Sequence, residues 1–212
     1  MINIKRKINS NTFYFDYRKA VYWGDEKTLI LADLHVGKVM HFRKNGSALP
    51  MKASSNNLLA LRGLINFYNP KKVIFLGDLF HSSFNLEWNE WINFFNSSGL
   101  NFTLVIGNHD KETHIIKNIE KLNIVFQLEL NGFLLSHHPK TKNGYVNFCG
   151  HIHPSISLSL IGNRKIKLQC FSITKNQVVF PAFGKFTGSF EINKQDDMEY
   201  LIIGEKRIFQ KV

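Results

Sequence analysis

The sequence predicts an α/β fold with two sets of strands, and three observations lead to this prediction. Two short apolar runs, 28–33 and 72–78, each end on a carboxylate, as buried strands with polar tips do. Apolar residues recur at helical spacing over 53–68 and 86–96. After His137 the chain becomes a series of short strand-like runs separated by Gly and Asn. Alternating strands and helices favour a layered α/β fold, and the later strands favour a second, largely antiparallel sheet.

The elements follow from these patterns in chain order. The first helix places Leu58, Leu61 and Leu64 on one face, and the second places Trp88 and Trp91 on one face, so both faces are expected to pack in the core. The segments 1–27 and 189–212 are expected to pair with the sheets. The predicted strands are 28–33, 72–78, 102–108, 133–137, 145–149, 155–160, 165–173 and 177–180.

Length and composition limit the possible classes of protein. The 212 residues, 44% hydrophobic and 20% charged, predict a single folded domain over 1–212 and exclude a disordered chain. The net charge of +11 favours anionic partners. The two cysteines, Cys149 and Cys170, are too few for a disulfide framework, so both are expected to be free thiols. Without a secretory signal or a long apolar run, the protein is expected in the cytoplasm, away from membranes.

Metal-ligating residue types gather at the predicted strand ends. We expect these residues to meet at the carboxyl edge of an open α/β sheet, where ligands bind in such folds. Carboxylates and imidazoles without a thiolate suit Mn, Fe, Zn or Co. The motifs are Asp33-Leu34-His35, Gly77-Asp78, Gly107-Asn108-His109-Asp110, His137 and Gly150-His151-Ile152-His153.

Spacing within the motifs predicts local geometry. Asp33 and His35 are two residues apart, so on a strand their side chains would share a face and approach one ion. His151 and His153 obey the same rule, although a loop would send them to two neighbouring ions. Gly77, Gly107 and Gly150 precede candidate ligands, where a tight turn or a close approach of a phosphate requires a residue without Cβ.

The complete motif series resembles that of the calcineurin-like metallophosphoesterase family, over 33–153. It is most similar to the DNA-ligase-associated metallophosphoesterases, because the chain also carries His41-Phe-Arg-Lys-Asn-Gly46 leading to Pro50, and Pro181-Ala-Phe-Gly184 with Thr187-Gly188. The resemblance implies a four-layer α/β/β/α sandwich.

The resemblance also implies a role for each motif residue. One metal ion would be held by Asp33, His35 and His153, the other by Asn108, His137 and His151, with Asp78 bridging them. His109 would be a catalytic histidine without a metal, and Asp110 would hold its ring directly or through the backbone turn.

Three basic or histidine positions leave alternatives open. Neighbouring strand residues face opposite sides, so only one of His137 and His138 should reach the metal, and His137 is the choice. Arg43 would contact substrate phosphates, or lie on a solvated helix face. His81 would be a surface or otherwise satisfied histidine, or would line the cleft, since it lies three residues beyond Asp78.

The predicted function is hydrolysis of phosphodiesters by hydroxide bound to two divalent metal ions, preferably Mn, with Fe, Zn or Co as alternatives. The resemblance further implies a phosphodiesterase or endonuclease of DNA repair, acting with a DNA ligase and a helicase. Two alternatives stay open. One is a small-molecule phosphatase or cyclic-nucleotide phosphodiesterase, and the other is a nucleic-acid-binding scaffold without catalysis.

Overall fold

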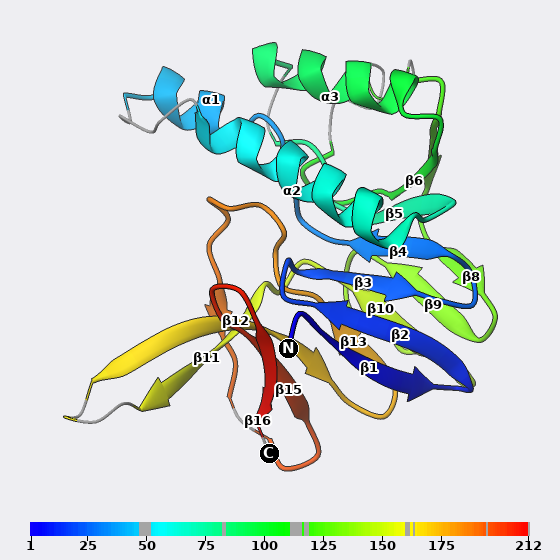
Figure 1. The fold of residues 1–212 in the computed structure, drawn as a ribbon, viewed down its shortest axis with the longest axis vertical. Helices are drawn as coiled ribbons and strands as arrows, with labels where there is room; N and C mark the ends of the chain where they lie inside the picture. Colours follow the sequence, from blue (N-terminus) through cyan, green and yellow to red (C-terminus); the bar gives the residue numbers. More distant parts are fainter. Residues whose placement is uncertain are drawn as a thin grey trace.

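Two β-sheets pack face to face in the computed structural model, with helices on the outer side of the first sheet (Figure 1). The structure describes residues 1–46, 52–81, 84–110, 116, 119–159, 162, 164–193 and 195–211. Pro50, in a motif quoted above, and Leu160, in a predicted strand, lie outside these residues.

The first sheet has seven strands in the order β1-β2-β3-β4-β5-β6-β7. The first four pair antiparallel, and β4 to β7 are parallel, so the parallel strands end at one edge. The N-terminal segment pairs with this sheet as expected. The strands are β1 (Asn3–Ile8), β2 (Asn11–Asp16), β3 (Ala20–Trp23), β4 (Thr28–Leu31), β5 (Lys72–Leu76), β6 (Asn101–Val105) and β7 (Leu122–Val125).

Helices α2 and α3 cover the outer face of the first sheet, and α1 lies near the candidate site. Leu58, Leu61 and Leu64 of α2 pack with Trp88 and Trp91 of α3 in one buried cluster with that sheet. Both predicted helices and their buried faces are therefore confirmed. The helices are α1 (Lys38–Lys44), α2 (Lys52–Tyr68) and α3 (Leu86–Ser97).

The second sheet is largely antiparallel, as expected, with five antiparallel pairings among the described strands, but three further pairings are parallel. Strands β9, β10 and β13 are parallel neighbours, because each connection returns the chain to the same starting edge before the next strand pairs. The strand predicted over 133–137 belongs to this sheet. The strands are β8 (Leu128–Leu130), β9 (Phe133–Ser136), β10 (Val146–Cys149), β11 (Pro154–Ser159), β12 (Lys165–Ile173), β13 (Gln177–Val179), β14 (Phe190–Glu191), β15 (Glu199–Ile203) and β16 (Ile208–Lys211).

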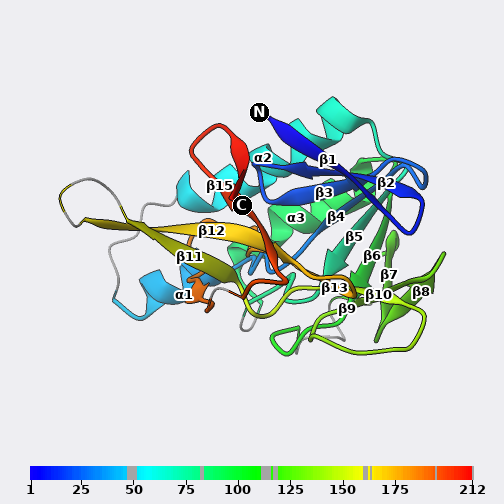
Figure 2. The same cartoon turned by 90° about the horizontal axis from the view of Figure 1, so that it is seen from below.

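The main core lies between the sheets. Ile30 and Ile74 of the first sheet pack with Phe148 and Phe171 of the second. The α/β class with two sheets is confirmed. In the described ranges no helix covers the outer face of the second sheet, so the fourth layer of the expected α/β/β/α sandwich is not seen there (Figures 1 and 2). The side chain of Asn147 is buried. Its Oδ1 accepts the N–H of Lys140, which lies in the loop that follows β9.

Both cysteines are buried and free, as expected from the sequence. Neither approaches a disulfide partner, and each lies within a strand of the second sheet. Among the described helices, none has the length and apolar character needed to cross a membrane.

Candidate metal centre

The candidate site lies where the carboxyl ends of β4, β5 and β6 meet the ends of β9 and β10. Past the strand ends, the chain after β4 stays bonded to the chain after β5: His35 N–H donates to Asp78 O at 2.9 Å, and Val36 N–H donates to Leu79 O at 2.8 Å. These bonds hold the two loops side by side, so Asp33, His35 and Asp78 project from one fixed backbone.

The backbone at five candidate ligands is left-handed rather than extended. The φ angles are 54° at Asp33, 51° at His35, 50° at Asp78, 68° at His151 and 51° at His153. Non-glycine residues rarely adopt this region, and those that do concentrate at functional sites. The strand geometry predicted for Asp33 and His35 is therefore wrong, because β4 ends at Leu31.

Gly77 has the left-handed φ of the expected tight turn, 82°, and all three predicted glycines are also required by close packing of the loops. A Cβ on Gly77 would lie 2.1 Å from His137 Nδ1, one on Gly107 would lie 2.2 Å from Asp78 Oδ1, and one on Gly150 would lie 2.4 Å from Asp33 Oδ2. The space beside each glycine is filled by a candidate ligand from another loop. These glycines let the loops approach closely enough to form one centre.

Asp33, His35 and His153 form the first group of candidate ligands, with their ligating atoms within 4.8 Å of one another. Asp33 Oδ1, His35 Nε2 and His153 Nε2 are buried and have no hydrogen-bond partner among the described residues, and Asp33 Oδ1 lies 3.2 Å from His153 Nε2. Asp33 Oδ2, in contrast, accepts the N–H of His151 at 3.0 Å. Leaving three buried polar atoms unpaired is costly, and a divalent cation between them would satisfy all three.

His137 is the centre of the second group. Its Nδ1 lies 2.9 Å from the carbonyl oxygen of Leu76, which can only accept, so Nδ1 carries the proton and Nε2 carries a lone pair. Nε2 faces Asn108 Oδ1 at 2.9 Å and His151 Nδ1 at 3.2 Å. Lone pairs that converge in this way fit a shared cation.

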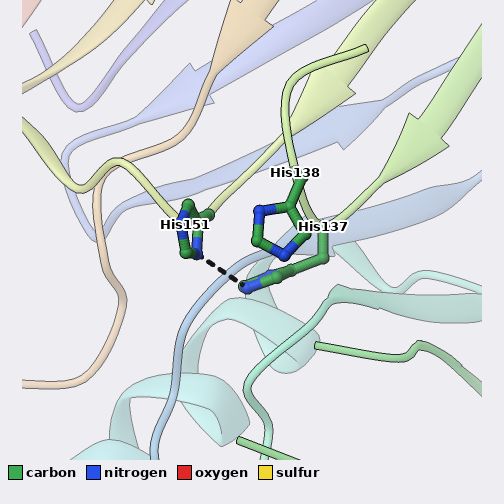
Figure 3. A group of neighbouring side chains, drawn as sticks. All are labelled: His137, His138 and His151. Atoms are coloured by element: carbon green, nitrogen blue, oxygen red, sulfur yellow. Dashed lines mark hydrogen bonds between the residues drawn. The ribbon is translucent and has the colours of Figure 1, made fainter. Parts of the chain in front are cut away.

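His138 also turns toward this group, contrary to the expectation that only one of the two neighbours would. Its ring centroid lies 4.0 Å from that of His151 and 4.8 Å from that of His137 (Figure 3). Strand alternation does not apply here, because β9 ends at Ser136. His137 is buried and His138 is exposed, so the two differ in their contact with solvent.

Asp78 lies between the two groups. Its Oδ2 is 3.7 Å from His35 Nε2 and 3.6 Å from His137 Nε2, while Oδ1 accepts the backbone N–H of His109 at 2.8 Å. One carboxylate oxygen is thus held by the 107–110 turn, and the other faces both sets of imidazoles. His151 and His153 lie in different groups, which matches the loop alternative for that motif.

The electrostatics favour neutral imidazoles. Burial lowers the pKa of His35 to about 2, assisted by the charge of Lys38. Burial likewise lowers the pKa of His151, with smaller effects from His138 and His137. A neutral imidazole offers the lone pair that metal binding requires.

His109 and His81 lie next to the first group. The ring centroid of His109 is 5.2 Å from that of His35 and 5.0 Å from that of His81. His81 Nδ1 is 3.3 Å from His35 Nδ1, and burial lowers the pKa of His81 to about 4. The only signal for His81 in the sequence was its closeness to Asp78. In the structure its ring lies beside those of His35 and His109.

The carboxylate of Asp110 contacts the backbone. It accepts N–H groups of Phe80 at 3.0 Å and Gly107 at 2.8 Å, so it ties the loop after β6 to the loop after β5. Asp110 was expected to hold the His109 ring either directly or through the backbone turn, and these backbone contacts fit the second alternative. Burial raises the pKa of Asp110 to about 7.

Lys38 is a basic residue whose charge acts on the centre. Lys38 is half-buried, and burial lowers the pKa of its ammonium group. The negative charges of Asp78 and Asp33 attract that ammonium group and partly oppose the shift. Arg43 lies on the exposed last turn of α1. In the sequence, only the position of Lys38 shortly after the Asp33-Leu34-His35 motif pointed to this role.

The chain is similar to known proteins in fold and in sequence. The nuclease MPE of Pseudomonas putida has a solved structure with a TM-score of 0.84, at 24% sequence identity, covering 99% of this chain and 100% of that chain. Yfce, a phosphoesterase from E. coli, matches with a TM-score of 0.44 and 15% identity, over 87% of this chain and 97% of that chain. No curated protein matches the sequence significantly. The sequence model of the calcineurin-like phosphoesterases matches residues 26–193, and the chain therefore belongs to the calcineurin-like phosphoesterase family.

Proposed function

We propose that this protein is a two-metal phosphodiesterase that acts on nucleic acid. The observation that supports it most strongly is a set of buried ligand atoms that lack a hydrogen-bond partner in the described part of the chain, beside the lone pair of His137. These atoms are Asp33 Oδ1, His35 Nε2 and His153 Nε2. Two adjoining groups of this kind, with Asp78 between them, suit a pair of divalent ions.

Asp33, His35 and His153 would hold one ion, and Asn108, His137 and His151 the other, with Asp78 shared. When bound, such a pair supplies Lewis acidity, which lowers the pKa of a water and neutralises charge on a phosphoryl group. We propose Mn as the preferred ion, with Fe, Zn or Co as alternatives. All the donors are oxygen or imidazole nitrogen, which these ions accept.

His109 is proposed as the catalytic histidine. Its backbone is fixed by the bond to Asp78 Oδ1, and its ring lies beside those of His35 and His81. From there it would stabilise the phosphoryl oxygens by hydrogen bonding or protonate the leaving oxygen, a role that contributes about 10²–10⁴-fold in general acid catalysis. Asp110 would keep the 107–110 turn, and so the His109 backbone, in place.

Lys38 and Arg43 are proposed to act on the substrate. Lys38 already interacts with the charges of Asp33 and Asp78, so its ammonium is placed to attract a phosphate to the centre. Arg43 would contact a phosphate further from the centre, on the exposed turn of α1.

A nucleic-acid substrate accords with the net charge of +11, because cationic surfaces concentrate polyanions. The similar fold of a nuclease adds to this argument. The narrower assignment, a cytoplasmic DNA-ligase-associated enzyme of DNA repair that works with a ligase and a helicase, depends on the motif resemblance.

The test is hydrolysis of bis(p-nitrophenyl) phosphate, a diester, against p-nitrophenyl phosphate, a monoester, with added Mn. The His109→Ala variant, prepared in parallel, controls for contaminating enzymes. We expect chelator-sensitive diester cleavage that this variant loses. Faster cleavage of the monoester would favour a small-molecule phosphatase. Equal, negligible rates for both proteins with every metal would favour a non-catalytic scaffold.

A further inference from the structure

The hairpin formed by β11 and β12 begins at the candidate centre and extends beyond it. Pro154, the first residue of β11, directly follows His153. Because β12 is antiparallel to β13, and β13 is parallel to β10, the start of β12 lies past the edge where β10 delivers His151. Figures 1 and 2 both show the hairpin projecting from the sheets. The hairpin therefore continues outward from the centre.

The two faces of this hairpin differ in chemistry. On the outer face, Ile156 and Leu158 pack with Cys170 and Leu168 in a small apolar cluster. On the other face, Ser157 pairs with Lys167 and Ser159 pairs with Lys165. Phe171 has the same strand parity as both lysines and is buried between the sheets, so the lysine-bearing face continues the inner face of the second sheet.

This face is cationic over its described length. Lys165 and Lys167 are exposed, and Lys167 Nζ donates to Ser189 O at 2.7 Å, which holds it beside the loop that leads to β14. The sequence contains no Asp or Glu between Glu129 and Glu191, although seven Lys or Arg residues fall there. Glu191, in register with Ser155 on the edge strand β14, is the acid that adjoins this face.

We propose that the lysine-bearing face of this hairpin binds the phosphate backbone of a nucleic-acid strand whose scissile bond lies at the metal centre. This inference rests on the proposed function. Along the strand, Ser157 is four residues past His153 and Ser159 is six past it, or about 13 Å and about 20 Å at an extended rise. Lys167 and Lys165 thus lie at increasing distance from the centre, beyond the reach of a small diester.

A nucleic acid suits this face better than other anions. The charges form a row that leads away from a site for phosphodiester chemistry, and a serine stands opposite each lysine as a hydrogen-bond donor to phosphate oxygens. An anionic membrane would also be attracted by lysines, but the apolar side chains of the hairpin are largely packed on its opposite face. Binding to anionic vesicles is therefore an outcome that the test must separate.

The test measures binding of a labelled single-stranded oligonucleotide of about twelve residues to the full chain in EDTA, over a range of salt. We expect the K165Q/K167Q variant to bind roughly tenfold more weakly at low salt than the wild type. The slope of log K against log salt should fall in magnitude by about 1.4, because each single-strand phosphate contact contributes about 0.7.

The matched control is K72Q/K121Q, which removes the same charge at the opposite, amino-terminal ends of β5 and β7. It should bind like the wild type, and equal losses in the two variants would overturn the proposal. A second variant has the opposite sign: Glu191→Gln should bind a few-fold more tightly, since an adjoining acid is removed. If Glu191→Gln does not bind the oligonucleotide more tightly and K165Q/K167Q binds it like the wild type, the proposal is also overturned.

Two further measurements separate this inference from the proposed function. In Mn, the ratio of kcat/KM for the oligonucleotide to that for bis(p-nitrophenyl) phosphate should fall about tenfold in K165Q/K167Q. If the wild type cleaves no diester but the binding differences persist, the proposed function fails and the binding face stands. If the wild type binds phosphatidylserine vesicles but not the oligonucleotide, the binding face is refuted and diester cleavage is unaffected.

Discussion

His137, which follows β9 of the second sheet, donates its Nδ1–H to the carbonyl oxygen of Leu76, the last residue of β5 in the first sheet, at 2.9 Å. This hydrogen bond links the ends of the two sheets and also sets which imidazole nitrogen is free. The free Nε2 faces Asn108 and Asp78. Orientation of a ligand by its second ring nitrogen typically affects metal affinity about 10–100-fold.

Replacing His137 by Gln should therefore lower Mn affinity by at least about 100-fold, because both the ligand and its fixed orientation are lost. Calorimetric titration with Mn measures this. His138→Gln is the matched comparison, since the two rings are adjacent but only His137 is bonded to Leu76. A larger loss in His138→Gln than in His137→Gln would contradict the assignment.

Lys38→Met should lower kcat/KM for the diester by about tenfold or more, because it removes the cation that acts on Asp33 and Asp78. Lys38→Arg should retain most of the activity. Arg43→Met tests the other proposed substrate contact on α1, and a larger loss there than at Lys38 would make Arg43 the main contact.

Gly107→Ala should disturb the centre while the chain stays folded. The added Cβ would lie 2.2 Å from Asp78 Oδ1, so the carboxylate or the turn must shift. We expect lower Mn affinity and a stability loss of about 1–3 kcal/mol, as for overpacked sites. Gly188→Ala is the control, because no atom of the described residues outside its immediate neighbours in the chain lies within 4 Å of its added Cβ. Unchanged metal affinity in Gly107→Ala would show that the contact does not position Asp78.

The lowered pKa of Lys19 predicts that its contribution to the stability of the fold rises at alkaline pH. Burial, with a smaller effect of the charge of Lys185, lowers the pKa of Lys19 from 10.5 to about 8. Between pH 8 and 10.5 the unfolded chain binds more protons than the folded chain, so the Lys19 contribution to stability increases with pH over that interval. Below pH 8 the charged, buried amine destabilises the fold.

Urea unfolding of Lys19→Met measures this contribution. At pH 7 the variant should be more stable than the wild type, by on the order of 1–3 kcal/mol. The difference should vanish by about pH 10.5, the ordinary pKa of the group. A difference that is the same at both pH values would assign the effect to packing instead of to charge.

The helices and most strands could be predicted because local periodicity reflects burial. Leu58, Leu61 and Leu64 share a face at helical spacing, and that face is the one packed against the first sheet. The candidate ligands could be found for a similar reason, since residues such as Asp33 and Asp78 stand just beyond buried strands. The exact strand end was not predictable from the apolar run alone.

The features that could not be predicted from the sequence depend on contacts between distant segments. The left-handed backbone at Asp33 and His35 is imposed by hydrogen bonds to the 77–79 loop. The parallel pairing of β9 and β10 depends on how the intervening loop returns, which periodicity does not encode. Lys38 differs from Arg43 through burial against neighbouring elements, a tertiary property.

The left-handed φ angles at Asp33, His35, Asp78, His151 and His153 have a consequence for how this sequence can change. Each position holds a side chain in a conformation that costs of order 1–3 kcal/mol and that glycine adopts without strain. Random drift at these positions toward glycine would relax the backbone while deleting a candidate ligand. Here selection for stability and selection for activity act in opposite directions, and a stability screen of the chain would enrich variants that have lost the metal centre.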